Sequence, residues 1–184
     1  MRNIMYAAVG LMMTTATAMA AGTPYHEGSA TIIEPTDERN PLAEVVSGID
    51  FRKSMIREMQ EDEFSNPGMI VIDYGAEIWE QVDGTAGKSL SDVWASCAGM
   101  DAATAAVSYP RYHEGAGKVI SLEQQINYCR ETAMGAEPYK WEKADMLGMT
   151  AFIRYQGNGE TVNVSIDGPA AATYERGKEL YYQR

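Results

Sequence analysis

GAEIWEQVDGTAGKSLSDVW, residues 75–94, is the stretch that decides how this chain folds. It holds the end of one predicted helix, a glycine-rich loop and the first turn of a second helix that begins at Leu90. Upstream, Asn66 is suited to cap the first helix and Pro67 to occupy its first position. Apolar side chains follow at a spacing of three or four residues until Asp83-Gly84 ends the helix: Val71, Tyr74, Ile78 and Val82.

Part of this stretch recurs near the other end of the sequence. GAEIWEQ (75–81) is matched by GKELYYQ (177–183) in the pattern G-x-E-[Ile/Leu]-[Trp/Tyr]-x-Q. The second copy falls in a helix predicted over residues 170–183, whose apolar and aromatic side chains need a surface to pack against. We therefore expect residues 161–184 to be a linker and the first helix of a truncated second domain of the same kind. The alternative is a single domain that ends in a docked helix.

Helical periodicity also predicts the elements between these copies. Small residues indicate a thin helix over 98–107, and Ser121 begins a helix with an apolar stripe of Leu122, Ile126 and Cys129. We interpret residues 108–118, SYPRYHEGAGK, as a loop. No alternating run is long enough to build a sheet, so the predicted fold class is mainly α. Two further helices are expected, a short one within 51–59 and one over 143–156 that turns Met146, Met149 and Ile153 inward.

The first twenty residues are typical of a cleaved secretory signal. Arg2 precedes a short apolar run, and Ala18-Met19-Ala20 fits the small-x-small cleavage pattern. The apolar run is too short for a membrane anchor, which is the alternative interpretation. Residues 21–50 are predicted to form a polar, extended arm. The chain carries 15 Lys and Arg against 26 Asp and Glu, a formal charge of −11, which argues against nucleic acid as a partner.

Cys97 and Cys129 are the two cysteines of the sequence. In an exported protein a disulfide is the simplest interpretation, and closing such a loop contributes roughly 3–4 kcal/mol. Two alternatives stay open on the residues alone. A zinc site would need ligand spacings that these cysteines and the two histidines lack. A Cys-His hydrolase would need a free thiolate beside a histidine.

The helix, loop and helical turn of residues 75–94 resemble the beginning of a class I c-type cytochrome. Such a domain carries C-x-x-C-H at the second turn, where two thioethers and a histidine hold haem. Here the matching positions read Leu90-Ser91-Asp92-Val93-Trp94. Further stretches resemble the N-terminal half of the SoxA family, the larger cytochrome subunits of the SoxAX complex of sulfur oxidation: MQEDEFSNPGM (59–69), AGKS (86–89), YPRY (109–112), SLEQQINYCR (121–130), AEPYKWE (136–142) and LGMTAFI (147–153).

The resemblance implies that residues 51–160 form a cytochrome-c-like domain that has lost its haem. Leu90, Val93 and Trp94 would fill part of the vacated space. In dihaem members of the family, a cysteine at the position of Cys129 is the distal ligand of that haem. Without iron to bind, Cys129 would pair with Cys97. No cofactor and no metal is then expected on residues 1–184, and haem c is expected in a C-terminal domain beyond them.

The same resemblance implies a function for the whole protein. SoxAX is a periplasmic L-cysteine S-thiosulfotransferase that couples thiosulfate oxidatively to a cysteine of the carrier protein SoxYZ, with electrons leaving through haem. The expected partners are SoxX, SoxYZ and thiosulfate, with no nucleic acid and no membrane. No catalytic residue is expected within this chain, which would supply a structural N-terminal domain. The alternative is a stand-alone, haem-free, disulfide-stapled periplasmic interaction module.

Charged residues and one histidine are the remaining candidates for a site. Arg111, Lys118 and Arg130 carry positive charge that would attract an anionic substrate, and His113 lies between an arginine and two glycines. We interpret the three basic residues as solvated surface and His113 as an ordinary loop histidine.

Overall fold

The computed structural model describes residues 32–33 and 44–183. The predicted signal peptide and most of the predicted arm lie outside the described residues. Contacts divide the chain into two parts, residues 1–57 and 58–184, which are described separately. In the first part β1 (Ile32–Ile33) pairs antiparallel with β2 (Val45–Val46), and a 3-10 turn, η1 (Gly48–Phe51), follows. The short helix predicted within 51–59 is α1 (Ser54–Glu61).

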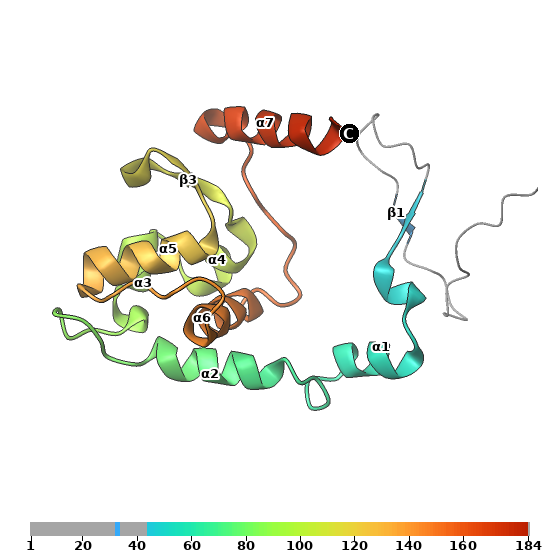
Figure 1. Ribbon diagram of the computed structural model, residues 1–184, viewed down its shortest axis with the longest axis horizontal. Helices are drawn as coiled ribbons and strands as arrows, with labels where there is room; N and C mark the ends of the chain where they lie inside the picture. Colours follow the sequence, from blue (N-terminus) through green and yellow to red (C-terminus); the bar gives the residue numbers. More distant parts are fainter. Residues whose placement is uncertain (1–31, 34–43, 184) are drawn as a thin grey trace, which may run out of the picture. The chain divides into compact units, whose positions relative to one another are not determined.

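The second part is organised around two packed helices, α2 (Met69–Trp79) and α6 (Ala144–Tyr155) (Figure 1). Their backbones cross closely because a glycine from each helix lies at the crossing. A Cβ built on Gly75 would lie 2.1 Å from the carbonyl oxygen of Gly148, so no larger residue fits there. The inward residues predicted for α6 are confirmed, since Met146, Met149 and Ile153 are buried.

Two predictions for α2 were wrong. The helix begins at Met69, with Gly68 as its N-cap, and the Asn66 side chain instead accepts a hydrogen bond from the Gly68 amide in the preceding turn (2.9 Å). The predicted apolar stripe is also much narrower than expected, because only Ile78 is buried and Val82 lies beyond the helix end. α2 makes its main contact with α6 along a narrow line through Gly75, and this leaves the flanking members of the stripe, Val71 and Tyr74, 41 % and 36 % exposed.

Three shorter helices complete the helical core: α3 (Leu90–Ala98), α4 (Ala102–Ser108) and α5 (Leu122–Cys129). Side-chain caps fix where they begin. Ser89 and Ser121 each form a capping box with the residue three positions on, and Asp101 caps α4. The start predicted at Ser121 is confirmed, and Leu122, Ile126 and Cys129 are fully buried. The thin helix predicted over 98–107 is divided, because Gly99 adopts a left-handed conformation that ends α3.

Residues 108–118 were predicted to be a loop, but part of this segment forms a β-hairpin. β3 (Arg111–His113) pairs antiparallel with β4 (Lys118–Ile120) around the short turn η2 (Glu114–Ala116). Strands of three residues are too short to show an alternating pattern, which is why periodicity missed them. Both two-stranded ribbons are small, and the mainly α class predicted from the sequence is confirmed.

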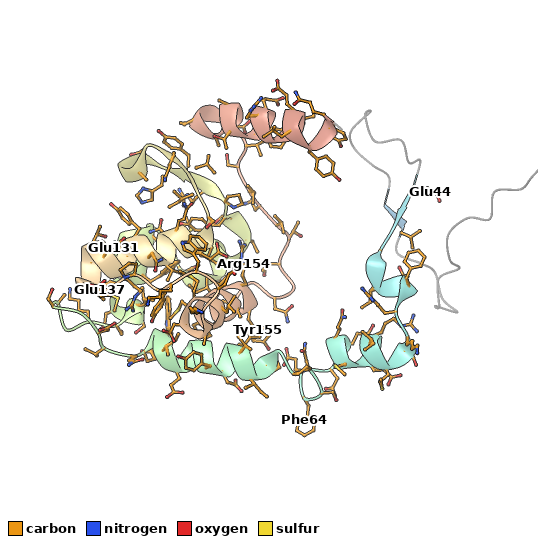
Figure 2. All side chains as sticks on the ribbon, in the orientation of Figure 1. Glu44, Phe64, Glu131, Glu137, Arg154 and Tyr155 are labelled. Carbon is orange, nitrogen blue, oxygen red and sulfur yellow. A yellow bond between two sulfur atoms is a disulfide. The ribbon has the colours of Figure 1, made fainter. Side chains whose placement is uncertain are left out.

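Long-range hydrogen bonds join the helices of the second part. Arg154 in α6, labelled in Figure 2, donates to the carbonyl oxygens of Ala106 in α4 and of Tyr109, just after α4. The hydroxyl of Tyr155 donates to Glu63 in the loop before α2. Beyond α5 the chain makes a π-helical turn, η3 (Arg130–Met134).

The last helix, α7 (Ala171–Tyr182), follows the 3-10 turn η4 (Gly168–Ala170) and buries none of its own residues. Leu180 and Tyr181 are 56 % and 75 % exposed. Among the described residues, no helix combines the length and the apolar character needed to cross a bilayer.

Candidate functional site

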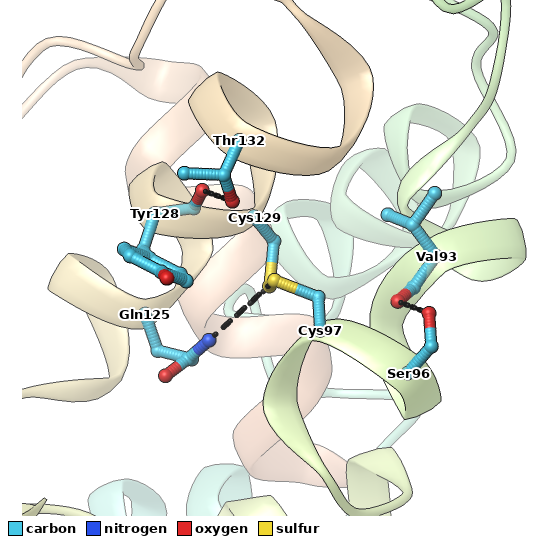
Figure 3. The surroundings of a disulfide bond; sticks show 7 residues. All are labelled: Val93, Ser96, Cys97, Gln125, Tyr128, Cys129 and Thr132. Atoms are coloured by element: carbon cyan, nitrogen blue, oxygen red, sulfur yellow. Dashed lines mark hydrogen bonds between the residues drawn. A yellow bond between two sulfur atoms is a disulfide. The ribbon is translucent and has the colours of Figure 1, made fainter. Parts of the chain in front are cut away.

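The two cysteines meet where α3 packs against α5. Cys97, near the end of α3, is joined by a disulfide to Cys129, the last residue of α5, with a Cα–Cα distance of 5.7 Å (Figure 3). Cys129 is fully buried within the core, whereas Cys97 is partly exposed. The bond therefore connects the surface of α3 to the interior.

A buried amide lies beside this bond. Gln125, one turn before Cys129 in α5, is fully buried. Its Nε2 donates to Cys129 Sγ at 3.2 Å and lies 3.8 Å from Cys97 Sγ (Figure 3). Its Oε1 is buried and has no hydrogen-bond partner. Helical periodicity does not single out Gln125, although its place on the face that carries Leu122 and Cys129 is a signal in the sequence.

Leu90, Val93 and Trp94 occupy the core at the start of α3. Their exposed fractions are 0 %, 3 % and 2 %, so none of them faces solvent. The ring of Trp94 packs against Trp79 of α2 with centroids 5.6 Å apart, and Trp79 packs in turn on Phe152 of α6 at the same distance. The Trp94 indole nitrogen is buried without a partner. Trp94, Trp79 and Phe152 thus form an aromatic row across α3, α2 and α6.

These residues do not fit covalent haem. Thioether attachment needs two cysteine sulfurs and haem iron needs an axial ligand. Leu90 and Val93 carry no sulfur, and both cysteines of the chain are consumed by their disulfide. The described histidine, His113, lies in β3, where its Nδ1 accepts from the Ala116 amide at 3.0 Å.

Arg130 was interpreted from the sequence as a solvated surface residue, and this interpretation is wrong. It is 4 % exposed and lies at the start of η3. Its guanidinium donates to Asp83 at 2.6 Å and to the carbonyl oxygen of Glu137 at 2.9 Å, and it stacks on the ring of Tyr139 at 3.7 Å. Hydrogen bonding by Arg130 holds the pKa of the Asp83 carboxyl below its usual value. Nothing in the sequence could pair these residues, because Asp83 and Arg130 lie 47 positions apart.

This ion pair lines a cleft of about 540 Å³ beside α2. Tyr74 and Asp145 also line the cleft, and the Tyr74 hydroxyl donates a hydrogen bond to the Asp145 carboxylate at 2.5 Å. This hydrogen bond raises the pKa of Tyr74. The formal charges of the lining residues sum to zero, with Arg130, Lys140 and Lys143 against Asp83, Glu137 and Asp145.

The other charged candidates do not converge on this cleft. His113 packs edge-on against Tyr128 in α5, with ring centroids 4.4 Å apart. Arg111 lies beside the sulfur of Met100, and Lys118 lies across the hairpin from His113. Within residues 32–33 and 44–183, no three His, Cys, Asp or Glu side chains are grouped so that they could hold a metal ion.

Comparison with known proteins agrees with this arrangement. Residues 74–162 match the family described as SoxA/TsdA, cytochrome c domain. The chain is 41 % identical over 152 residues to the L-cysteine S-thiosulfotransferase subunit SoxA of Pseudaminobacter salicylatoxidans, covering 80 % of this chain and 51 % of that protein. It is 39 % identical over 141 residues to the subunit of the same name from Rhodovulum sulfidophilum, covering 77 % and 49 %.

A solved structure is also similar. The crystal structure of SoxXA from P. pantotrophus superposes with a TM-score of 0.64 at 35 % identity, over 77 % of this chain and 53 % of that one. The chain spans about half the length of the relatives it matches. The mainly helical core and the sequence similarity to these SoxA subunits agree with the family match, which shows that residues 74–162 resemble the SoxA/TsdA cytochrome c domain.

Proposed function

We propose that this chain is the N-terminal part of a SoxA subunit, which acts with SoxX as an L-cysteine S-thiosulfotransferase. In this proposal the complete complex couples thiosulfate to a cysteine of the carrier protein SoxYZ. The names of the relatives and the SoxXA structure support the assignment. Residues 51–160 serve as a haem-free structural and docking domain, and the chemistry belongs to the part of SoxA that these residues do not match.

One observation supports the structural role: the positions that resemble a haem-attachment turn hold packed side chains. Leu90, Val93 and Trp94 are buried in contact with neighbouring helices, and the disulfide has engaged Cys129. In this proposal the three side chains stand where a haem domain needs two attachment cysteines and an axial histidine, and they stabilise an apolar core instead. Haem c, which the family implies, is therefore assigned to a different domain of the full-length protein.

The repeated motif supports a second domain that begins with α7. In the first copy Gly75 lies against Gly148 of α6, and Ile78 is buried. In the second copy the matching Gly177 has no neighbouring atom within 4 Å, and the matching Leu180 is exposed. A glycine inside a helix costs about 1 kcal/mol relative to alanine, so it needs a reason outside that helix. We infer that α7 packs, as α2 does, against a helix of a second cytochrome-c-like domain.

The proposed location is the periplasm. The sequence pattern of residues 1–20 supports export, and disulfides form and persist in oxidising compartments such as the periplasm. Mass spectrometry of the mature protein recovered from periplasm would test this, with a new N-terminus after Ala20 as the expected result.

The first experiment measures covalent haem in this chain. The chain is exported from a host with an active c-type cytochrome maturation system and stained for haem after denaturing electrophoresis. No stain is expected, because the attachment cysteines are absent. The matched variant Leu90→Cys/Val93→Cys/Trp94→His restores the motif and shows whether the host can load it. Covalent haem on the unmodified chain would refute the proposal.

The second experiment concerns the coding sequence that follows Arg184. A C-x-x-C-H motif shortly beyond it supports the two-domain SoxA assignment. The full-length protein should then co-purify with SoxX and catalyse thiosulfate-dependent haem reduction when SoxYZ is present. A stop codon directly after Arg184 would refute that assignment and favour the stand-alone interaction module.

A further inference from the structure

The two sulfurs of the Cys97–Cys129 bond differ in how far a reagent could reach them. Cys97 is partly exposed near the end of α3. Cys129 is fully buried in the core cluster that also contains Leu122, Ile126 and Met149. Thiol–disulfide exchange begins with attack by a thiolate on one sulfur, and access decides which sulfur is attacked. Attack at Cys97 would make Cys129 the leaving group.

Gln125 is placed to assist that departure. Its Nε2 lies 3.2 Å from Cys129 Sγ, the sulfur that gains negative charge when the bond breaks, and 3.8 Å from Cys97 Sγ. Figure 3 shows the amide directed at the bond from α5. An N–H donor stabilises a sulfur more as charge grows on it, so this contact strengthens during the exchange.

The oxygen of the same amide has no partner while the bond is intact. Gln125 Oε1 is buried and unpaired, and neither sulfur of a disulfide carries a hydrogen to donate. Reduction creates two S–H donors beside the amide, whose Nε2 lies 3.2 Å and 3.8 Å from the two sulfurs, and a half-turn of the amide group would let Oε1 accept from one of them. Because a buried unpaired acceptor is costly, the surroundings of the bond favour the dithiol more than an apolar pocket would. A bond kept solely as a structural link would gain nothing from this arrangement.

We propose that Cys97–Cys129 is a reversible thiol–disulfide site of the folded protein, opened by a dithiol reductant. One thiolate of the reductant attacks Cys97 Sγ, the Cys97–Cys129 bond breaks, and Cys129 leaves and takes up a proton. The second thiol of the reductant then displaces Cys97, which is protonated in turn. The reductant becomes a disulfide, and the protein has gained two electrons and two protons.

The test uses the full chain equilibrated in defined ratios of reduced and oxidised dithiothreitol without denaturant. Acid quenching, alkylation and peptide mass spectrometry report the state of each cysteine, and circular dichroism reports the helices. We expect both cysteines to become reduced together while the helical signal is retained, and to re-form the bond on return to oxidised buffer. Reduction that occurs only together with loss of the helical signal would overturn the proposal.

A matched pair of variants tests the role of the amide. Gln125→Met keeps the length of the side chain but removes both polar atoms, and it should lower the equilibrium constant for reduction roughly tenfold. Ser96→Ala is the control, because the Ser96 hydroxyl donates to the Val93 carbonyl beside Cys97 without contacting either sulfur (Figure 3). Equal constants for Gln125→Met and Ser96→Ala would refute the assignment of the amide.

The identity of the attacked sulfur is tested separately with a monothiol. Reduced glutathione should form its mixed disulfide on Cys97, because Cys129 is enclosed by the core. This measurement does not depend on the stability of any variant. An adduct found mainly on Cys129 would contradict the proposed order of steps. None of these outcomes depends on thiosulfate, SoxX or haem, so this site and the proposed function can fail independently.

Discussion

Gly75 of α2 and Gly148 of α6 meet where the two helices cross. A Cβ on Gly75 would lie 2.1 Å from the Gly148 carbonyl oxygen and 2.6 Å from Cβ of Phe152, while a Cβ on Gly148 would lie 2.8 Å from the ring of Tyr74. A methyl group on Gly75 would collide with the backbone of α6, whereas a methyl group on Gly148 would require the ring of Tyr74 to move. The close approach brings Trp79 of α2 onto Phe152 and Trp94, and so sets the aromatic row.

Gly75→Ala should lower the free energy of unfolding by about 1–3 kcal/mol, because the added methyl group forces the two helices apart. Urea denaturation measures the change. The matched control is Gly177→Ala, at the equivalent place in the repeated motif, where no atom lies within 4 Å. In this chain the control should be neutral or gain up to about 1 kcal/mol. A destabilising Gly177→Ala would contradict the description of α7 as uncovered.

Trp94→Ala should cost about 3–5 kcal/mol of unfolding free energy, because it empties the centre of the core where the side chain is 2 % exposed. Trp141→Ala removes the same atoms from a side chain that is 56 % exposed and should change stability by about 0.5 kcal/mol or less. Thermal denaturation of the pair measures the difference. Similar melting temperatures for the two variants would mean that Trp94 does not fill the core.

Asp83→Asn should weaken the protein at neutral pH by up to about 1 kcal/mol, because Asp83 is a half-exposed partner of Arg130. The pKa of Asp83 is lowered in the folded state from a model-compound value of 3.8. Its contribution is therefore fully present above that value and is lost as the pH falls through the lower, folded pKa. The stability difference between wild type and variant should be constant above about pH 5 and shrink below about pH 4. An unchanged difference at pH 3 would contradict this.

Replacing both cysteines, Cys97→Ala with Cys129→Ala, should lower stability by about 3–4 kcal/mol, since the bond closes a loop between positions 32 residues apart. Guanidinium denaturation measures this change. The single variant Cys129→Ala, compared with wild type in reducing buffer, separates lost packing from lost loop closure. A double variant as stable as oxidised wild type would show that the bond does not restrain the unfolded chain.

Much of the helical core was predictable because the relevant signals are local. The start of α5 follows from Ser121 with Gln124, a capping box within four residues, and the burial of Leu122, Ile126 and Cys129 follows from helical spacing. The inward face of α6 was predictable for the same reason. The hairpin of β3 and β4 was not, since three residues per strand are too few to carry a period.

Some features of the candidate site were likewise predictable from the sequence, and others were not. That Leu90, Val93 and Trp94 stand at a cytochrome-like turn without its cysteines or histidine can be read from residues 75–94 alone. The burial of Arg130 cannot be predicted from the sequence, because its charge is compensated by Asp83, by a carbonyl oxygen and by the ring of Tyr139, all supplied by other segments. Its sequence neighbourhood looks like that of an ordinary surface arginine.

The sequence by itself determined the mainly α class, the two cysteines and the repeated motif, because each of these follows from residue identity and spacing. Only the tertiary structure decided which face of α2 is buried, that Gln125 lies against the disulfide with its oxygen unpaired, and that Gly75 is covered while Gly177 is open. The physical reason is that burial and hydrogen-bond satisfaction depend on what other segments bring to a side chain, and helical spacing specifies a face without specifying what covers it.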